Sequence, residues 1–559
     1  MTTTRLALVV RILIAISTRT FFQPDEYFQS LEPAYHAVFG YGYLSWEWLG
    51  PNPIRSIFYP ALNIPIYWTL RVSGLSEIYS IYSPRILHGA LAAATDVWIC
   101  EIVRRWLGSR YESLFLSLTC FFHALSLSRS LSNSLETSLT TIAFAYYPWD
   151  ASSSMSLQLI YNSARMRNVI LLSALACMVR PTNAVIWFYL FGKLFWILRS
   201  SQRASIALFK QVTAIGALTF CSLFLLDSLY YQKPTSTPFN FLLTNLSSVS
   251  LFYGSNVWHY YLTQALPILC TTALPFVLHG MWLVVFDKHA VALRNMLYCV
   301  LWSICIYSFA GHKEWRFIHP ILPLLHVFAA RSLVDISDHA TKQKTKAAAK
   351  NLAQNVSFLT QLAQYLPPVR RRFLSFLCLT IPVSVHIVLF YCSAPIGVLA
   401  YIRSLPTSEL DGSIGFLMPC HSTPGHAYLH RKELAHGKMW ALGCEPPLQG
   451  QDLSTYHDQT DVFFASPVEY LQTRFPSHVD PSFPPSPFPT SIPGAPHTND
   501  YPWIHEWPRH LVFFGALLEH EEVRNMLEAK GYREVWKRGK MWEGEGRRKG
   551  GVRVWRWSG

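Results

Sequence analysis

Long apolar runs alternate with short polar connections over the first two thirds of the chain. An apolar run of roughly 20 residues is long enough to cross a bilayer as a helix, and a shorter run can enter partway when protein shields it. This pattern predicts eleven helical segments: 5–20, 84–103, 111–128, 132–148, 168–179, 184–198, 208–229, 264–286, 293–310, 317–333 and 373–393.

Two neighbouring segments, 168–179 and 184–198, are short and flank the sequence Arg180-Pro181-Thr182-Asn183. Proline and polar residues favour a turn at that point. We therefore expect a hairpin of two half-depth helices there.

Composition and charge support a membrane protein. The chain has 559 residues, of which 51% are hydrophobic and only 14% are charged, whereas soluble domains carry about 25% charged residues. The formal net charge is +14. The basic residues stand in short patches between apolar runs, as the positive-inside bias requires. The charge therefore indicates topology, and we expect no nucleic-acid partner.

The basic loops set an orientation. We expect a cytosolic N-terminus and cytosolic loops near 104–110, 149–167, 199–207, 287–292 and 334–372, which hold most of the lysine and arginine. The first apolar segment has no small-residue cleavage site, so we interpret it as a retained anchor and not a signal peptide. The segments expected on the opposite, luminal side are 21–83, 129–131, 180–183, 230–263, 311–316 and everything after 394.

The last third of the chain differs from the rest. We expect a multi-span membrane domain over 1–393 and a small luminal α/β domain over 394–559. A proline-rich insertion at 481–497 cannot pack a core. Short strands are predicted at 462–464 and 511–514, and an amphipathic helix at 516–530.

Nine of the eleven cysteines lie in or beside apolar segments without metal-ligand spacing. Cys420 and Cys444 stand in the polar last third, where an oxidising lumen would permit a disulfide. The sequence leaves open whether they are bridged. Asn245 begins a glycosylation sequon in a luminal segment, whereas the sequon at Asn355 is expected to be cytosolic and unmodified.

Adjacent carboxylates follow the first apolar segment directly. Asp25 and Glu26 stand where the chain leaves the bilayer, a place where charge is costly unless it has a function. One of them can act as a general base on a bound hydroxyl, or both can be an interfacial pair that meets a cation. Tyr27 and Glu32 continue an amphipathic stretch, and Trp46 belongs to an aromatic group suited to the bilayer boundary or to stacking on sugars.

A second polar cluster lies between two apolar segments at 311–320 (GHKEWRFIHP). It places His312, Lys313, Glu314 and Arg316 within five positions. The cations suit an anionic phosphate, because arginine can donate two parallel hydrogen bonds to it and lysine supplies a compact positive charge. The alternative is a turn whose salt bridges satisfy one another. Arg180 is the third candidate, since an arginine within the membrane requires an anion.

Carboxylates and phosphate-binding cations on one face favour a sugar donor carried on a lipid phosphate. The carboxylate would deprotonate an acceptor hydroxyl, and the cations would hold the departing phosphate. A lipid phosphate is already a good leaving group, so we expect no metal and no other cofactor. The sequence has no Asp-x-Asp motif of nucleotide-sugar enzymes and no P-loop.

Six segments together resemble a known family, the dolichyl-phosphate-mannose-dependent mannosyltransferases of family 22, which have the GT-C fold. The resemblance runs from about residue 18 to at least 465, and residues 418–424 and 444–447 are similar to the branch that extends the glycosylphosphatidylinositol (GPI) precursor. The segments are PDEYFQSLEPAYHAVFGYGYLSWEW (24–48), YYPWD (146–150), MVRPTNAV (178–185), FYGSNVWHYYLTQALP (252–267), HKEWRFIHPILP (312–323) and MPCHSTP (418–424).

The resemblance implies transfer of the third mannose, through an α1,2 bond, to the GPI precursor at the luminal face of the endoplasmic reticulum membrane. The donor would be dolichyl phosphate mannose, and an α product from a β donor implies inversion with a single base. The residue that corresponds to this base is Asp25, and Glu26 is either the alternative base or a group that orients Asp25. From the chemistry of these residues we expect donor-phosphate binding by His312, Lys313, Arg316 and Arg180. We expect substrate binding by Tyr27, Glu32, Trp46, Glu314 and His259.

Other readings remain open. A sister enzyme acting on the N-glycan precursor or adding the fourth GPI mannose would share these motifs. A multi-span transporter or scramblase, or a structural subunit of an assembly complex, would also contain many spans and charges. The sequence identifies no protein partner.

Overall fold

The chain divides into two compact units, each assembled from three separate segments. The computed structural model describes residues 2–75, 78–109, 111–151, 163–344, 366–447, 452, 455–486 and 503–559. Met1–Ser17, Arg85–Leu226 and Tyr253–His386 form one unit, here called the helical unit. Thr18–Pro84, Asp227–Phe252 and Ile387–Gly559 form the other, here called the sheet unit. Parts of the proline-rich insertion and of the loops 149–167 and 334–372 lie outside the described residues, as does the whole sequon at Asn355.

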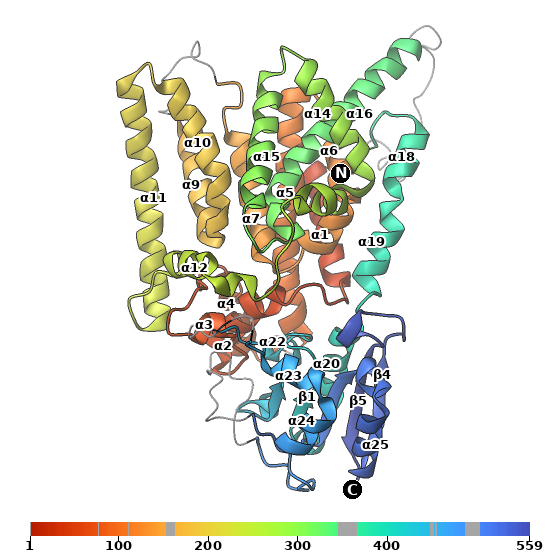
Figure 1. Cartoon of the computed structure of the whole chain (residues 1–559). Helices are drawn as coiled ribbons and strands as arrows, with labels where there is room; N and C mark the ends of the chain where they lie inside the picture. The colour runs from red at the N-terminus through yellow and green to blue at the C-terminus, as the bar shows by residue number, and fades with distance from the viewer. Residues whose placement is uncertain are drawn as a thin grey trace. The chain divides into compact units, whose positions relative to one another are not determined.

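The helical unit consists of long helices and short helical turns, and Figure 1 shows its long helices running in roughly one direction. Its elements are α1 (Thr3–Ser17), α5 (Ile78–Leu107), α6 (Tyr111–Thr119), η3 (His123–Leu127), α7 (Ser132–Tyr146), α9 (Ala164–Val179), η4 (Pro181–Asn183), α10 (Ala184–Leu198), α11 (Gln202–Tyr231), η6 (Tyr261–Ala265), α13 (Leu266–Cys270), η7 (Thr271–Ala273), α14 (Leu274–Phe286), α15 (Val291–Ser308), η8 (Trp315–Ile321), α16 (Leu322–Lys344), α18 (Arg371–Cys378) and α19 (Thr380–Leu389).

Each of the eleven predicted segments is helical over most of its length. Within the described residues, seven helical stretches are at least 18 residues long and apolar enough to cross a membrane: 78–107, 181–198, 202–231, 261–286, 291–308, 315–337 and 371–404. The chain is therefore a multi-pass membrane protein. The count of eleven crossings stays a prediction, because α1, α7 and α9 are shorter than that length.

The turn at Arg180 follows from the proline after it. A residue that precedes proline avoids the α conformation, and Arg180 has an extended backbone with φ −145° and ψ 112°. Helix α9 therefore ends at Val179, and Pro181 opens η4 with its fixed φ. The predicted break between two helices is present.

The sheet unit holds a five-stranded mixed sheet with the strand order β2-β1-β3-β5-β4. Strand β1 (Ile414–Phe416) runs parallel to β2 (Met439–Ala441) and to β3 (His510–Phe514). Strand β5 (Val552–Trp557) runs antiparallel to β3 and to β4 (Tyr532–Arg538). The α/β character expected for the last third of the chain is confirmed.

The remaining elements of the sheet unit are helices and short helical turns, several of which come from the first 84 residues. They are η1 (Tyr27–Leu31), α2 (Glu32–Phe39), α3 (Trp46–Leu49), η2 (Pro60–Leu62), α4 (Ile64–Ser73), α12 (Thr237–Leu246), η5 (Ser248–Leu251), α20 (Ala394–Ser404), α21 (Thr407–Leu410), α22 (His426–Leu429), η9 (Lys432–Leu434), α23 (Gln459–Ala465), α24 (Pro467–Arg474), η10 (Gly515–Glu519), α25 (Glu521–Ala529) and η11 (Gly546–Arg548).

The two faces of the sheet bury different partners, because side chains alternate along a strand. Val512 and Phe514 of β3 pack on one face with the segment after the acidic pair, including Tyr27 and Leu31. Leu511 of β3 packs on the other face, in a core that includes α24 and α25. The acidic segment near the N-terminus is thus held by the core of the sheet.

One predicted strand is wrong. Residues 462–464 belong to helix α23. Asp458 caps this helix, with its carboxylate accepting a hydrogen bond from the Asp461 backbone N–H at 2.7 Å. An aspartate three residues before a second acidic residue is a helix-start signal, and it outweighs the β propensity of Val462-Phe463-Phe464. The predicted strand at 511–514 lies in β3, and the predicted helix at 516–530 appears as η10 and α25.

Candidate active site

The acidic pair opens a helical segment of the sheet unit. Pro24 starts this segment, with its carbonyl accepting hydrogen bonds from the backbone N–H groups of Tyr27 at 2.9 Å and Phe28 at 3.0 Å. The π-helical turn η1 follows directly, and such turns recur at functional sites. Asp25 is half-buried, whereas Glu26 is only 3% exposed. Asp25 is therefore the more accessible of the two carboxylates.

Three residues expected to bind substrate lie in the protein interior. Tyr27 is 1% exposed and stacks on Phe21 at a centroid distance of 5.4 Å. Trp46 is buried, and Glu32 has no exposed surface. The sequence pattern placed them at an interface because it could not show contacts with distant segments, such as the packing of Tyr27 against Tyr428 at a centroid distance of 5.2 Å.

Glu32 holds two distant segments together. Its carboxylate accepts hydrogen bonds from the backbone N–H groups of Tyr43, at 2.8 Å, and Ala427. Burial raises the pKa of this carboxyl to about 7, although the backbone donors act in the opposite direction. A Cβ atom on Gly425 would lie 2.7 Å from the Glu32 carboxyl carbon, so only glycine fits there without a shift.

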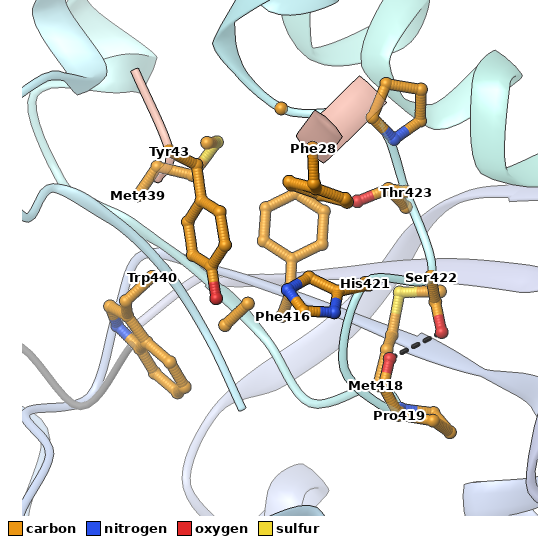
Figure 2. A pocket seen from close by; sticks show the side chains of 13 residues that line it. Phe28, Tyr43, Phe416, Met418, Pro419, His421, Ser422, Thr423, Met439 and Trp440 are labelled. Atoms are coloured by element: carbon orange, nitrogen blue, oxygen red, sulfur yellow. Dashed lines mark hydrogen bonds between the residues drawn. The ribbon is translucent and has the colours of Figure 1, made fainter. Parts of the chain in front are cut away.

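A small pocket adjoins the acidic segment within the sheet unit. Its walls come from Phe28, Tyr43, residues 416–425 and residues 439–441. Figure 2 shows the His421 ring near Phe28 and Tyr43, at centroid distances of 4.5 and 5.6 Å. Burial lowers the pKa of His421 to about 4, while the charge of Asp25 acts to raise it. The pocket is therefore electrostatically linked to Asp25.

Cys420 and Cys444 form a disulfide beside this pocket. The imidazole of His421 lies close to them, with its Nδ1 3.7 Å from the Cys444 sulfur. These three side chains have the spacing of a metal site, but cysteines joined in a disulfide offer no thiolate to a metal. The cluster is thus a covalent link between the segments before and after β2.

The cation cluster at 312–316 belongs to the helical unit and is satisfied within itself. The Arg316 guanidinium forms two hydrogen bonds to the Glu314 carboxylate, at 2.6 and 2.8 Å. His312 Nε2 lies 3.2 Å from the same carboxylate. Lys313 Nζ donates to the Asn256 carbonyl at 2.8 Å. The ion pairs are those of the expected alternative, a turn whose salt bridges satisfy one another, while Lys313 is bonded outside the turn.

Glu314 sets the charge of the cluster. Burial alone would raise the pKa of Glu314, but Arg316 and His312 together hold it well below its usual range. The hydrogen bond to Glu314 in turn raises the pKa of His312. Arg316 and a histidine that protonates readily face one carboxylate, and Lys313 adds a further cation, so the cluster keeps a net positive charge.

Arg180 joins this cluster through a shared aromatic ring. Its guanidinium lies 5.5 Å from the Phe317 ring centroid, and the Arg316 guanidinium lies 5.6 Å from the same ring. Arg180 also approaches the Glu136 carboxylate, with Nε 3.4 Å from Oε2. The structure thus brings together two predicted cation sites that are far apart in the sequence. His259, by contrast, is half-buried and contacts Thr263 at 3.0 Å.

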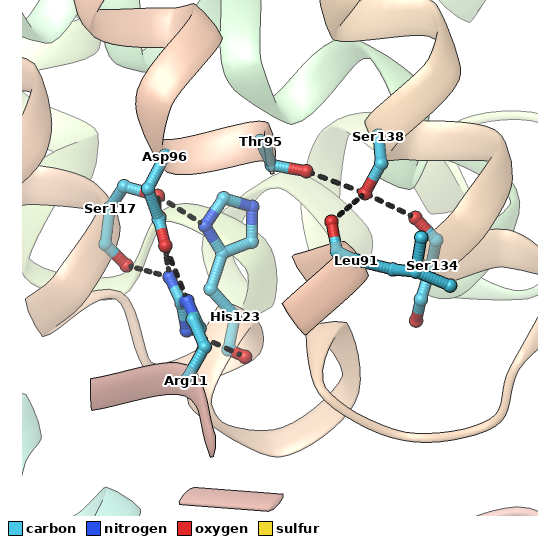
Figure 3. A network of polar contacts seen from close by, with 8 residues as sticks. All are labelled: Arg11, Leu91, Thr95, Asp96, Ser117, His123, Ser134 and Ser138. Atoms are coloured by element: carbon cyan, nitrogen blue, oxygen red, sulfur yellow. Dashed lines mark hydrogen bonds and ion pairs between the residues drawn. The ribbon is translucent and has the colours of Figure 1, made fainter. Parts of the chain in front are cut away.

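Sequence reasoning missed Glu136 and Asp96, two carboxylates in apolar segments. Figure 3 shows Asp96 and its polar contacts. Asp96 forms a bidentate ion pair with Arg11, at 2.7 and 2.8 Å, and accepts a hydrogen bond from Ser117 at 2.6 Å. Ser117 lies 2.8 Å from His123 Nδ1. A carboxylate inside an apolar run was the available signal for both.

The chain is similar to several known proteins over most of its length. GPI mannosyltransferase 3 of Yarrowia lipolytica is 33% identical over 476 residues, 84% of this chain and 82% of the relative. GPI alpha-1,2-mannosyltransferase 3 of Homo sapiens is 33% identical over 489 residues, 85% of this chain and 77% of the relative. The crystal structure of ArnT from Cupriavidus metallidurans bound to undecaprenyl phosphate has a TM-score of 0.55 at 11% identity, covering 99% of this chain and 97% of ArnT.

The chain shares its fold with ArnT over almost its whole length, and the expected GT-C fold, with many apolar helices and a small C-terminal sheet, is confirmed. Residues 2–430 match the Alg9-like mannosyltransferase family, and the chain belongs to that family. The predicted resemblance is confirmed. The transporter, scramblase and assembly-subunit readings are set aside, because a chain of this family is a glycosyltransferase.

Proposed function

We propose that the chain adds the third mannose, through an α1,2 bond, to the GPI-anchor precursor, with dolichyl phosphate mannose as donor. Curated relatives that match more than four fifths of the chain are named GPI mannosyltransferase 3 or GPI alpha-1,2-mannosyltransferase 3. The mechanism rests on one observation: the half-buried Asp25 carboxylate lies near the pocket that Phe28, Tyr43 and His421 line.

Asp25 acts as the general base. It accepts the proton of an acceptor hydroxyl while that oxygen attacks the anomeric carbon of the donor mannose. The bond from that carbon to the phosphate oxygen breaks, and dolichyl phosphate leaves with the electron pair. One displacement inverts the configuration, so a β-linked donor gives an α-linked product. Glu26, buried behind Asp25, orients the segment.

The cation cluster binds the donor phosphate in this proposal. Arg316 is paired with Glu314, so a phosphate must share or replace that carboxylate. Lys313 and Arg316 supply fixed positive charge, and His312 adds more when protonated. Stabilising the charge that grows on the leaving phosphate is commonly the largest single contribution of such a site. We propose that these side chains carry out that task without a metal.

Substitution of the two carboxylates tests the proposal. Purified protein is assayed with dolichyl phosphate mannose and a two-mannose GPI acceptor, comparing Asp25→Asn with Glu26→Gln. Because a general base contributes about 10²–10⁴-fold, Asp25→Asn should lower kcat by that factor, and Glu26→Gln should lower it much less. Transfer by Asp25→Asn at the wild-type rate would discard Asp25 as the base.

The acceptor is tested in the same assay. Three-mannose GPI and N-glycan precursors serve as alternative acceptors, and digestion by an α1,2-specific mannosidase identifies the new bond. Preference for either alternative acceptor would assign the chain to a sister enzyme. Protein partners beyond these lipid-linked substrates are left unassigned.

We also propose that the chain resides in the endoplasmic reticulum membrane with its N-terminus cytosolic and the sheet unit luminal. Three segments assigned to the lumen by the charge pattern, 21–83, 230–263 and the region after 394, contribute most of the sheet unit. Asn245 is exposed on α12. A glycosidase-sensitive mass shift that Asn245→Gln removes would support this orientation, and glycosylation at Asn355 would reverse it.

A further inference from the structure

Helix α12 exposes a continuous row of apolar side chains. Positions three and four apart lie on the same face of a helix, and this spacing holds for Phe239, Leu242, Leu243 and Leu246. Each of these four residues is between 52% and 77% exposed, and together they are here called the apolar face of α12. Asn245, the proposed glycosylation site, lies about 100° around the helix from Leu246, at the edge of this face.

The place of α12 in the chain favours a lipid surface as its partner. Helix α11 is long and apolar enough to cross a membrane, and α12 follows it after the short connection 232–236. With ten residues α12 is too short to cross, since a span needs about 20. Its sequence contains no charged residue. A helix with one apolar face can lie in the plane of the membrane interface, with that face in the lipid.

The opposite side of α12 is bonded to the connection between α3 and η2. Asn240 Nδ2 donates a hydrogen bond to the Pro53 carbonyl at 2.9 Å. Thr237 Oγ1 donates to the Asp227 carboxylate at 2.6 Å, and the Ser56 hydroxyl donates to the same carboxylate at 2.8 Å. These bonds fix the side of α12 that faces the protein, and the apolar face points away from that side.

The same connection reaches the acidic segment. Tyr231, the last residue of α11, donates from its hydroxyl to the Arg55 carbonyl at 2.7 Å. The Arg55 guanidinium donates to the Glu47 carboxylate at 2.6 and 2.9 Å, and Gln29 Nε2 donates to that carboxylate at 3.1 Å. Gln29 belongs to η1, which directly follows the acidic pair. A series of contacts therefore joins α12 to the segment that bears Asp25.

We propose that α12 lies in the headgroup region of the bilayer, with its apolar face against the acyl chains, and that it holds the acidic segment at a fixed height above the membrane. The second part rests on the proposed function. A donor carried on a lipid presents its phosphate at the bilayer surface, so the general base must stay at that level. Because displacements of about 1 Å can slow a reaction a hundredfold, the residues of α12 are positioning residues for Asp25.

Spin labels test whether the apolar face meets lipid. The parent protein carries Cys221→Ser and Cys305→Ser, which remove the free cysteines with exposed side chains, and is reconstituted into phosphatidylcholine vesicles. Single cysteines then replace Leu243 or Leu246 and are labelled with a nitroxide. Collisions of each label with dissolved oxygen, which concentrates in lipid, are compared with its collisions with a water-soluble nickel chelate.

Two further positions calibrate the labels. Leu218→Cys is the lipid control, because Leu218 is 67% exposed on the apolar helix α11, and Glu519→Cys is the water control, because the Glu519 side chain is 55% exposed. We expect the ratio of oxygen to chelate collisions at Leu243 and Leu246 to lie nearer to the lipid control. A ratio like that of the water control, or few collisions with either reagent, would overturn the proposal.

Transfer rates test the second part. Leu243→Glu places a charge on the apolar face, and Leu243→Phe keeps that face apolar. Gln232→Glu adds the same charge in the exposed connection before α12 and is the matched control. Each variant is assayed with dolichyl phosphate mannose in vesicles, and with a short-chain, water-soluble donor in detergent micelles, where no bilayer surface fixes the height of the phosphate.

We expect Leu243→Glu to lower kcat by roughly 10–100-fold in vesicles and to match wild type with the short-chain donor. Leu243→Phe and Gln232→Glu should match wild type in both assays. Equal losses with both donors, or an unchanged rate in vesicles, would overturn the second part. If wild type transfers no mannose, the proposed function fails, while the spin labels still decide whether α12 lies in the lipid.

Discussion

Glu32 and Ala427 stand 395 positions apart in the sequence and are joined by a hydrogen bond from the Ala427 backbone N–H to the Glu32 carboxylate. This bond ties the segment that follows the acidic pair to the segment that follows the pocket. Because the carboxyl has no exposed surface, its protonation is coupled to folding.

We expect stability of the sheet unit to fall as pH rises from about 4.5 to about 7, owing to Glu32. Burial raises the pKa of Glu32 to about 7 in the folded state, so the folded protein binds the proton more tightly than the unfolded chain. The free energy of unfolding therefore decreases with pH in that window, by up to roughly 3 kcal/mol. Thermal unfolding in detergent at a series of pH values measures this slope.

The Glu32→Gln variant should flatten the slope, because an amide does not titrate. Glu519→Gln serves as the control, since the Glu519 side chain is 55% exposed and its removal should leave the slope unchanged. An identical slope in wild type and Glu32→Gln would contradict the coupling.

The ion pair between Arg11 and Asp96 should be far more important for stability than its exposed counterpart. Both side chains are completely buried, so Asp96→Asn leaves an uncompensated charge, at a cost of about 3–5 kcal/mol. Arg104 and Glu101 form a similar pair at 2.7 Å with the Arg104 side chain 55% exposed. Arg104→Gln should change stability by less than about 1 kcal/mol. The unfolding temperatures of the two variants and wild type, measured in the same detergent, test this difference. An equal decrease in unfolding temperature for both variants would contradict it.

Gly280 should tolerate no side chain. A Cβ atom there would lie 1.8 Å from the Phe328 carbonyl oxygen, where α14 meets α16. Gly280→Ala must separate the two helices, and we expect a loss of several kcal/mol or failure to accumulate. Gly192→Ala in α10 has no atom within 4 Å and should be neutral or slightly stabilising. Expression and monodispersity by size-exclusion chromatography provide the comparison.

The disulfide between Cys420 and Cys444 should stabilise the sheet unit. It closes a loop with a sequence separation of 24, and loops of that length correspond to about 3 kcal/mol in the chain-entropy account. The Cys420→Ser/Cys444→Ser double variant should unfold at a lower temperature, and a reductant should lower the unfolding temperature of wild type but not of the double variant. Two extra reactive thiols in the native wild type would refute the bond.

The hydrophobic pattern predicted the helices well, because a run of apolar residues long enough to span a bilayer has few alternatives to helix. The break at Arg180 was predictable for a similar local reason, since Pro181 constrains it. The strand expected at 462–464 failed because the pattern weighed Val462-Phe463-Phe464 and overlooked the cap at Asp458.

The sequence predicted which residues belong to the candidate site but not how they are arranged. The sequence indicated the acidic pair and the cations, but it could not show that Arg180 and Arg316 share the ring of Phe317. Nor could it distinguish Asp25 from Glu26, since their exposure depends on packing against residues hundreds of positions away. The catalytic roles themselves stay predictions.

The sheet unit also imposes an order on biosynthesis. Strand β5 lies between β3 and β4 yet follows both in the chain, so the sheet cannot close until the ribosome has passed residue 557. The segment that bears Asp25 is translated first and packs on that sheet. At roughly 5–20 residues per second it waits on the order of tens of seconds for its partner. During that interval the apolar side chains of this segment lack the strands against which they pack in the folded chain.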